Sequence, residues 1–441
     1  MRTFCAVAAL ACCILSGCTK DMRYRYFPDQ TCSPSPCINL PARVPGPGWE
    51  LAFVEFKDNG DPWDVRQTNE AVKLIEQAKA DNGGAAIVLV YVHGWKNNAN
   101  DAPPPKEKDV EKFKHALNAV AKDFSRLSQG GKLPPLVGIY MGWRGGTLNA
   151  EPGKTLSYWF RRAVGRRVGR KGLFDSMTRI IDTAKPPGET RTKLIVVGHS
   201  FGARLLENAV DELDARNRTE GRMLAWQRSL PDQPTGMRAQ EPPVDLVVFV
   251  NAATQSSISE KTIKRLKDKK TVFYGSGLSA EDCKDDPTGE QRRECRPIPL
   301  YLAVTSTGDT ATRFVLPIAN AVIPPAPLPL RLRAAAFTSR LRSHEVEEVP
   351  CPPVVPYRCG PSGDREFCFE SMRDERRTCY EVKRKSGGSN RTPFWAMTVD
   401  PRVIKDHGDI WTPNVVDLFS AILIRTGAAD VNARRAMSTV R

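Results

Sequence analysis

Ser200 lies on a short run whose residue types and spacing suit nucleophilic chemistry. It stands two residues after Gly198 and two before Gly202, between the apolar run Leu194–Val197 and a segment with helical periodicity. A serine on such a strand-to-helix turn lifts its hydroxyl above the sheet, and residues two positions away would collide unless they lacked side chains. The main-chain N–H of Phe201 would then point at a developing oxyanion. We therefore predict that Ser200 is a nucleophile.

A serine hydroxyl is a poor nucleophile until a base takes its proton, and the chain offers five histidines. His93 and His199 belong to two loops with other expected roles. His115 lies away from the apolar stripe of its predicted helix, so we expect it to face solvent. His344 lies in a long polar insertion and is the second choice. His407 follows the last predicted strand and precedes the last predicted helix, and we predict that it is the base.

The run around Ser200 resembles the nucleophile elbow of the α/β-hydrolases, G-x-S-x-G, in the strand–turn–helix context that this motif requires. In that superfamily the chain order is nucleophile, acid, histidine, and the acid follows a late strand. Asp309 fits this place because it follows the predicted strand Leu300–Val304 and a short polar turn; a helix N-cap is its alternative role. The resemblance covers roughly residues 50–426 and implies a catalytic triad of Ser200, Asp309 and His407.

His93 and Gly94 close the predicted strand Ala85–Val92 and look like the oxyanion loop of the same superfamily. Gly94 permits the tight turn, and the N–H of Trp95 would join that of Phe201 as the second oxyanion donor. His93 would brace the loop by hydrogen bonding; a buried structural turn is the alternative. Trp95 stands where the HGGG lipases have another glycine, so the choice of acyl group stays open.

Short apolar runs alternate with amphipathic segments through the body of the chain, which is typical of a parallel sheet covered by helices on both faces. The sequence thus predicts an α/β class, the α/β-hydrolase fold, over residues 49–426, with a stalk at 18–48 and a tail at 427–441. Insertions at 216–243 and 323–393 interrupt this pattern. The second contains four cysteines, and we expect a cap or lid over the site. Strands are expected at 50–56, 85–92, 135–141, 194–197, 246–250, 300–304 and 394–399.

Residues 1–17 have the features of an export signal. The apolar run Phe4–Ser16 is too short to span a bilayer but suits a signal-peptide core. It leads into Leu15-Ser16-Gly17-Cys18, which resembles the lipobox of bacterial lipoproteins and implies a lipid on Cys18 that anchors the chain to a membrane. An ordinary secretory signal is the alternative. No aspartate follows Cys18, so the resemblance implies an outer-membrane lipoprotein that faces the periplasm.

Twelve cysteines support export independently. Three leave with the signal and one would be acylated, so eight remain, and they cluster outside the motif-bearing strands. In an oxidising compartment they predict up to four disulfides, with Cys32–Cys37 and Cys283–Cys295 as local pairs. A zinc site is the rival, but no histidine lies among the last four cysteines and no C-x-x-C pair occurs. These four are expected to pair among themselves: Cys351, Cys359, Cys368 and Cys379.

The bulk composition suits a soluble globular protein, with 441 residues, 41% of them hydrophobic, and a formal net charge of +15. Such a charge is compatible with nucleic acid, anionic lipid or acidic substrates and selects none of them. A basic aromatic segment at 154–171 is expected to be a solvated helix face, with contact to lipid headgroups as the alternative. We expect no cofactor, no metal and no nucleic-acid partner.

The sequence therefore predicts a serine hydrolase that acts on a small-molecule ester or lipid substrate, or on a related acyl bond. An amide bond, as in a peptidase, is a third possibility, because fold does not fix substrate. A catalytically silent protein that serves the envelope as a scaffold or binding module is the alternative.

Overall fold

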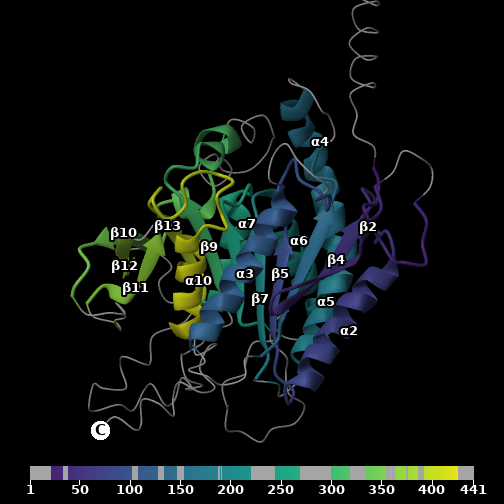
Figure 1. Ribbon diagram of the computed structural model, residues 1–441. Helices are drawn as coiled ribbons and strands as arrows, with labels where there is room; N and C mark the ends of the chain where they lie inside the picture. The colour runs from purple at the N-terminus through teal and green to yellow at the C-terminus, as the bar shows by residue number, and fades with distance from the viewer. Residues whose placement is uncertain are drawn as a thin grey trace, which may run out of the picture.

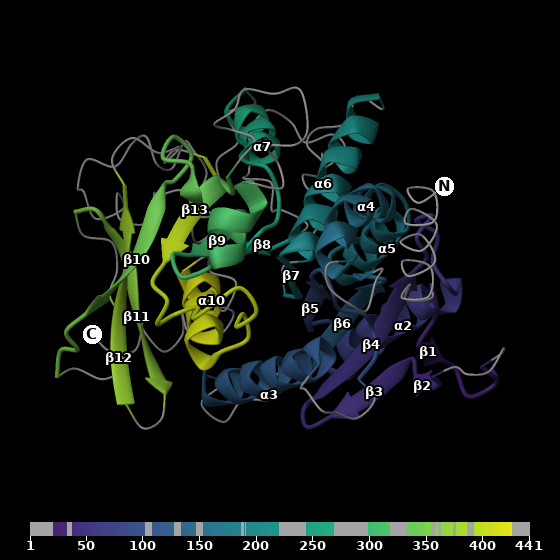
Figure 2. The same cartoon turned by 90° about the horizontal axis from the view of Figure 1, so that it is seen from above.

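An eleven-stranded sheet forms the centre of the molecule in the described part of the chain, and helices pack on both of its faces (Figures 1 and 2). The computed structural model describes residues 21–32, 38–101, 108–127, 134–146, 153–186, 189, 191–219, 244–268, 299–317, 333–353, 359, 363–373, 376–385 and 392–425. The α/β class expected from the sequence is confirmed.

The strand order across the sheet is β11-β12-β10-β13-β9-β8-β7-β5-β6-β4-β3. Every neighbouring pair from β10 through to β4 is parallel, and antiparallel strands complete both edges. Parallel strands end at the same edge, so the loops after them can meet there. The bounds are β3 Arg43–Gly46, β4 Trp49–Phe56, β5 Ile87–Val92, β6 Leu136–Trp143, β7 Lys193–His199, β8 Leu246–Val250, β9 Tyr301–Ser306, β10 His344–Val349, β11 Arg365–Arg373, β12 Arg376–Arg384 and β13 Phe394–Val399.

Two hydrophobic layers hold the helices to the sheet. One face packs against α2, α5, α6 and α7, and the other against α3 and α10. Because both faces are covered, β5, β6, β8, β9 and β13 are buried along their whole length, which explains their continuous apolar sequences. The helices are α2 Val65–Asp81, α3 Asp109–Leu127, α4 Gly153–Val168, α5 Phe174–Ala184, α6 Phe201–Thr219, α7 Ser256–Asp268 and α10 Pro413–Arg425.

The predicted strands and helices agree closely with the observed ones. The strands expected at 246–250 and 394–399 have the predicted bounds, and the other five differ by at most a few residues. The basic segment at 154–171 lies on α4 and on the π-helical turn Gly169–Leu173 that joins α4 to α5. Arg166 and Arg167 are exposed there, as expected for a solvated face, whereas Arg161 is buried.

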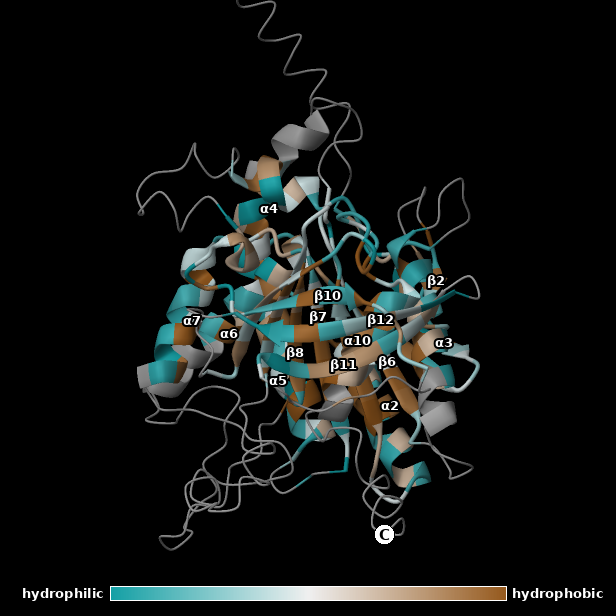
Figure 3. Cartoon of the chain, turned by 90° about the vertical axis from the view of Figure 1, so that its left-hand side faces the viewer, coloured by the Kyte–Doolittle hydropathy of each residue, from teal (hydrophilic) through white to brown (hydrophobic). Residues whose placement is uncertain are grey.

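The cysteine-rich insertion differs from the expected lid where the structure describes it. Its strands β10, β12 and β11 continue the central sheet beyond β13 instead of forming a separate cap (Figure 2). Figure 3 looks onto these three strands from their side of the molecule. β10 pairs with β13 in parallel, and His344 lies opposite Met397. Pairing with an existing edge satisfies the main-chain hydrogen bonds of β10, and α10 contacts β11.

The segment expected as a stalk is packed on the domain over its described residues. β3 pairs antiparallel with β4, and short strands β1 (Arg25–Tyr26) and β2 (Leu40–Pro41) pair with each other. Arg25 is fully buried, pairs with Asp101 at 2.9 Å and lies 3.5 Å from the ring centroid of Phe53. Burying a charge is tolerated only with such partners, so this segment is part of the fold.

Two disulfides join the last four cysteines, as predicted: Cys351–Cys379 and Cys359–Cys368. The first links the end of β10 to β12. Cys37, Cys283 and Cys295 lie outside the described residues, so the other two pairs stay predictions. The described residues hold no cluster of histidine, cysteine, aspartate or glutamate suited to a metal ion.

The export signal at 1–17, Cys18 and the tail at 427–441 lie outside the described residues, and so do residues 220–243 of the first insertion. No helix within the described ranges is both long enough and apolar enough to cross a membrane.

Candidate active site

Ser200 lies on the turn between β7 and α6, at the carboxyl edge of the sheet. Its φ is 55°, in the left-handed region that residues other than glycine rarely occupy. The N–H of Ser200 donates to Val250 O at 2.9 Å, and its carbonyl accepts from the N–H of Ala253 at 3.0 Å. Such a conformation costs on the order of 1–3 kcal/mol and persists where the surroundings fix it. The loop after β8 therefore holds the strained elbow in place.

The two glycines of the elbow are required by close backbone approaches. A Cβ on Gly202 would lie 2.0 Å from Val92 O, and one on Gly198 would lie 2.7 Å from Ala203 Cα. Neither neighbour is a flexible side chain that could move away. The spacing noted in the sequence therefore has the steric cause that was expected.

His407 joins Ser200 to Asp309. Its Nε2 lies 2.7 Å from Ser200 Oγ, and its Nδ1 lies 2.9 Å from Asp309 Oδ2. The three residues come from the loops after β7, β9 and β13, whose carboxyl ends lie at one edge of the sheet. Asp309 is fully buried, whereas the His407 side chain is 30% exposed. The structure thus brings together the residues predicted as nucleophile, base and acid.

The carboxylate of Asp309 is held in one orientation. Its Oδ1 accepts from the N–H groups of Ala311 and Thr312 at 2.9 and 3.1 Å, and its Oδ2 accepts from Thr312 Oγ1 at 2.5 Å. Burial raises the pKa of Asp309, but the hydrogen bond and charge of His407 and the bonds from Thr312 outweigh it and lower the pKa. Asp309 therefore accepts main-chain hydrogen bonds as a helix N-cap residue does, and its carboxylate also contacts the imidazole of His407.

Two further residues, which the sequence reasoning missed, position the loop of His407. His199 Nε2 lies 2.7 Å from His407 O, and Asn251 Nδ2 donates to the carbonyls of Asp406 and His407 at 3.3 and 3.2 Å. Asn251 Oδ1 accepts from the N–H of Ser306 at 3.0 Å. Asn251 directly follows β8 with a φ of 45°, a conformation that asparagine adopts more readily than most residues. In the sequence, only the position of a single asparagine directly after an apolar run could have pointed to this role of Asn251.

His93 braces the loop after β5. The N–H of Trp143 donates to His93 Nε2 at 3.0 Å, so the ring proton lies on Nδ1, which donates to Gly94 O at 2.9 Å. The indole of Trp143 donates in turn to His93 O at 3.0 Å. Burial lowers the pKa of His93 to about 4, which keeps the ring neutral at physiological pH. These contacts match the bracing role expected for His93.

The backbone at Gly94 lies against the elbow. A Cβ added to Gly94 would stand 3.1 Å from Ser200 Cβ and 2.9 Å from His199 Nδ1. The next residue, Trp95, is partly buried, and its ring centroid lies 6.2 Å from that of Phe201. The two residues whose N–H groups were predicted as oxyanion donors are therefore neighbours beside the serine.

The remaining two histidines lie elsewhere. His115 is exposed on α3, as expected. His344, the second choice for the base, begins β10, stacks on Trp395 with ring centroids 3.9 Å apart, and its Nδ1 lies 2.8 Å from Ser343 Oγ. Burial lowers the pKa of His344 to about 3. His344 is therefore a core residue.

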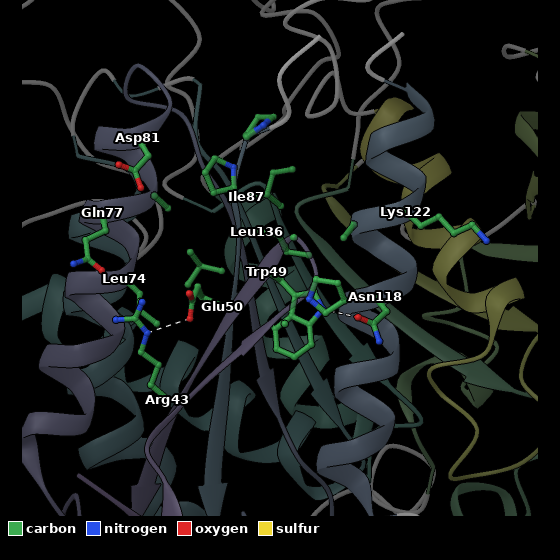
Figure 4. Close-up of a pocket in the computed structure, with 18 residues that line it drawn as sticks. Arg43, Trp49, Glu50, Leu74, Gln77, Asp81, Ile87, Asn118, Lys122 and Leu136 are labelled. Carbon is green, nitrogen blue, oxygen red and sulfur yellow. Dashed lines mark hydrogen bonds and ion pairs between the residues drawn. The ribbon is translucent and has the colours of Figure 1, made fainter. Parts of the chain in front are cut away.

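A separate cavity of about 820 Å³ opens at the opposite edge of the sheet (Figure 4). Trp49, Ile87 and Leu136, the first residues of β4, β5 and β6, line it. The Trp49 indole donates to Asn118 Oδ1 at 2.7 Å. None of the predicted site residues lines this cavity, so it is distinct from the site at Ser200.

No protein-family model matches the sequence, and no curated protein matches it. Among solved structures, the chain is similar to a Trichoderma reesei cutinase in complex with a C11Y4 phosphonate inhibitor, with 12% identity over 43% of this chain and 65% of the cutinase, and a TM-score of 0.18. It is also similar to an uncharacterized protein from Pseudomonas aeruginosa, with 9% identity over 85% of this chain and 52% of that one, and a TM-score of 0.29. The chain thus spans less than two thirds of either protein.

Proposed function

We propose that this protein is a serine hydrolase of the α/β-hydrolase type that cleaves a carboxylic ester or a related acyl bond. The observation that carries the proposal is the unbroken line of contacts from Ser200 Oγ to His407 Nε2 at 2.7 Å and from His407 Nδ1 to Asp309 Oδ2 at 2.9 Å. A hydroxyl, an imidazole and a buried carboxylate in this order are the groups that acyl transfer through a serine requires.

In the proposed reaction, His407 Nε2 takes the proton of Ser200 as Oγ attacks the carbonyl carbon. Asp309 keeps the other ring proton on Nδ1 and stabilises the imidazolium. The N–H groups of Trp95 and Phe201 stabilise the tetrahedral oxyanion, and each such donor is worth about 3–4 kcal/mol. The alcohol leaves with the proton from His407, and an acyl-enzyme remains. Water, deprotonated by His407, then releases the acid and restores the serine.

The surroundings of the triad support this role. Ser200 is held in a strained conformation by contacts with the loop after β8, so little reorganisation is needed before attack. Burial and the charge of His407 lower the pKa of His199 to about 3. His199 therefore stays neutral and adds no second positive charge beside the base.

We further propose that the chain is exported and held at the cell envelope by a lipid on Cys18, facing the periplasm from the outer membrane. The lipobox-like sequence at residues 15–18 supports this anchor. The disulfides in the β10–β12 region support an oxidising compartment. Incorporation of labelled palmitate that is lost in Cys18→Ala would support the anchor, and equal incorporation by both chains would contradict it.

A fluorophosphonate probe tests the nucleophile directly, because it reacts with an activated serine. The wild type should be labelled and should hydrolyse p-nitrophenyl esters of graded chain length, whereas Ser200→Ala should do neither. Ser176→Ala is the matched control, because Ser176 is also buried but lies in α5, bonded to Thr68 Oγ1. Equal labelling of wild type and Ser200→Ala would overturn the proposal. A folded wild type without labelling or turnover would favour a catalytically silent envelope module.

A further inference from the structure

Three arginines are buried in the described part of the chain: Arg25, Arg161 and Arg204. Arg25 pairs with Asp101 at 2.9 Å, and Arg161 donates to both carboxylate oxygens of Asp58, at 2.6 and 2.9 Å. Arg204 is 6% exposed, and its Nε and Nη1 have no hydrogen-bond partner. No described residue forms an ion pair with it. Arg161 Nε also lacks a hydrogen-bond partner, but Arg161 and Arg25 each have an ion pair with a carboxylate and Arg204 has none among the described residues. A buried guanidinium without a compensating charge is costly, so an anionic ligand would supply what Arg204 lacks.

Arg204 lies in the first turn of α6, where its N–H donates to Ser200 O at 3.4 Å. The helix α4 runs beside α6 (Figures 1 and 2). Gly165 on α4 and Gly169 just after it both lie against Leu205, where an added Cβ would stand 2.8 Å from Leu205 Cδ1 and 2.5 Å from Leu205 O, respectively. Arg162 is one turn before Gly165 on α4, and Arg204 directly precedes Leu205 on α6, so the two arginines lie close enough for their charges to interact.

Arg162 is half-buried, and its Nη1 is likewise a buried nitrogen without a hydrogen-bond partner. Tyr158, one turn earlier on α4, shares its face, and its ring lies 5.0 Å from that of Phe201 and 5.9 Å from that of Trp95. Arg204 is thus one helical turn from Phe201, and Arg162 is one turn from Tyr158, whose ring packs against Phe201 and Trp95.

Burial, and next the charge of Arg162, lower the pKa of Arg204 to about 10. Arg204 is thus still cationic at neutral pH. Glu207, one turn further along α6, is bonded to Ser259 Oγ at 3.0 Å. Burial raises the pKa of Glu207 to about 7, so its negative charge is incomplete at neutral pH. The region between α4 and α6 around Arg162 and Arg204 therefore carries a net positive charge.

We propose that Arg204 and Arg162 bind a carboxylate or phosphate group on the substrate of Ser200, so that the substrate is a negatively charged ester. This inference rests on the proposed hydrolase function. Guanidinium groups bind both anions through paired, charge-assisted hydrogen bonds. The anion would supply the partners that the buried nitrogens lack, while the ester carbon lies at Ser200.

Matched esters test the proposal. The substrates are p-nitrophenyl half esters of diacids of graded length, their neutral methyl esters, and p-nitrophenyl esters of phosphono acids of the same lengths. At one length or more, the wild type should favour an anionic ester over its neutral counterpart in kcat/KM by roughly 10- to 100-fold, which corresponds to one or two charge-assisted hydrogen bonds. Whether the carboxylate or the phosphonate series gains more identifies the anion.

In Arg204→Gln the ratio of anionic to neutral kcat/KM should fall toward one, mainly through KM, and Arg204→Lys should recover part of it. Arg162→Gln should lower the same ratio, and it serves as the second variant if Arg204→Gln is unstable. Arg179→Gln is the charge-matched control, because Arg179 lies exposed on α5, bonded to Asn69, and it should keep the wild-type ratio.

If the wild type and the variants hydrolyse all esters with the same ratio of anionic to neutral kcat/KM, the anion site is overturned. The hydrolase proposal would still stand. An equal fall in Arg179→Gln would also overturn the anion site, because a general charge effect would then explain the preference. No turnover of any ester would contradict both proposals.

Discussion

The imidazole of His199 donates to the main-chain carbonyl of His407, with Nε2 and O 2.7 Å apart. A carbonyl can only accept, so the proton of the neutral ring lies on Nε2. The residue immediately before the nucleophile thus fixes the loop that carries the proposed base. Asn251 donates to the same carbonyl at 3.2 Å, so two side chains from neighbouring strands hold one point of this loop.

His199→Phe should therefore lower kcat for ester hydrolysis about tenfold. Phenylalanine fills a similar volume, but it cannot donate to His407 O, and one hydrogen bond of about 1–1.5 kcal/mol corresponds to roughly this factor. Steady-state kinetics on a p-nitrophenyl ester would measure the loss, with circular dichroism to check the fold. An unchanged kcat in a folded variant would show that the His199 contact does not position the base.

Asp309→Asn should lower kcat roughly 10,000-fold, because an asparagine amide can hold the imidazole in the wrong tautomer. The variant should fold, since its side-chain oxygen can still accept from Thr312. Thr312→Val is the control. It removes the hydrogen bond that Thr312 Oγ1 donates to Asp309 Oδ2 at 2.5 Å but keeps the carboxylate, and it should lower kcat about tenfold. Equal losses in the two variants would contradict a special role for Asp309.

The free energy of unfolding should fall as the pH is lowered, in part because of His344. Burial lowers its pKa in the folded state to about 3, while the ordinary value is 6.5. Between these two values the unfolded chain binds a proton that the folded chain excludes, so the free energy of unfolding falls as pH drops below about 6.5. The slope for one proton is about 1.4 kcal/mol per pH unit.

His344→Gln should reduce the slope of the free energy of unfolding against pH by the contribution of about one proton. Urea unfolding at a series of pH values between the two pKa values would measure this slope. The comparison of variant with wild type cancels the other titrating groups. Parallel curves for His344→Gln and the wild type would disprove the assignment.

Removing the Cys351–Cys379 disulfide by a double serine substitution should lower the free energy of unfolding by about 3.5 kcal/mol, and removing Cys359–Cys368 by about 2.5 kcal/mol. The difference follows from their sequence separations of 28 and 9 residues, because a longer closed loop restricts the unfolded chain more. Denaturant unfolding would measure both. The opposite ranking would show that strand pairing, and not loop closure, determines the effect.

The members of the proposed triad could be predicted because each depends on a local pattern. The elbow is set by residues within two positions of Ser200, and His407 and Asp309 follow apolar runs that read clearly as strands. The role of Asn251 could not be predicted in this way. Its contact with residues 406 and 407 depends on β8 lying beside β7 and near the end of β13, and nothing near residue 251 encodes this arrangement.

The insertion was harder to predict because its strands are less apolar than the interior ones. β10 alternates buried His344 and Val346 with the more exposed Glu345, which is the two-residue period of a half-buried strand. The segment expected as a stalk, at residues 18–48, has an equally weak sequence pattern. Arg25 is polar, and only the distant Asp101 and Phe53 explain its burial.

β13, which leads to His407, pairs with β9 on one side and with β10 on the other. The strand that leads to the proposed base is thus an internal strand, and β11 is the terminal one. Fraying that begins at this border would separate β11 and β12 before it reached β13. Natural variants could therefore lengthen, shorten or replace the outermost hairpin, and so acquire new surfaces, while the arrangement of Ser200, His407 and Asp309 stays intact.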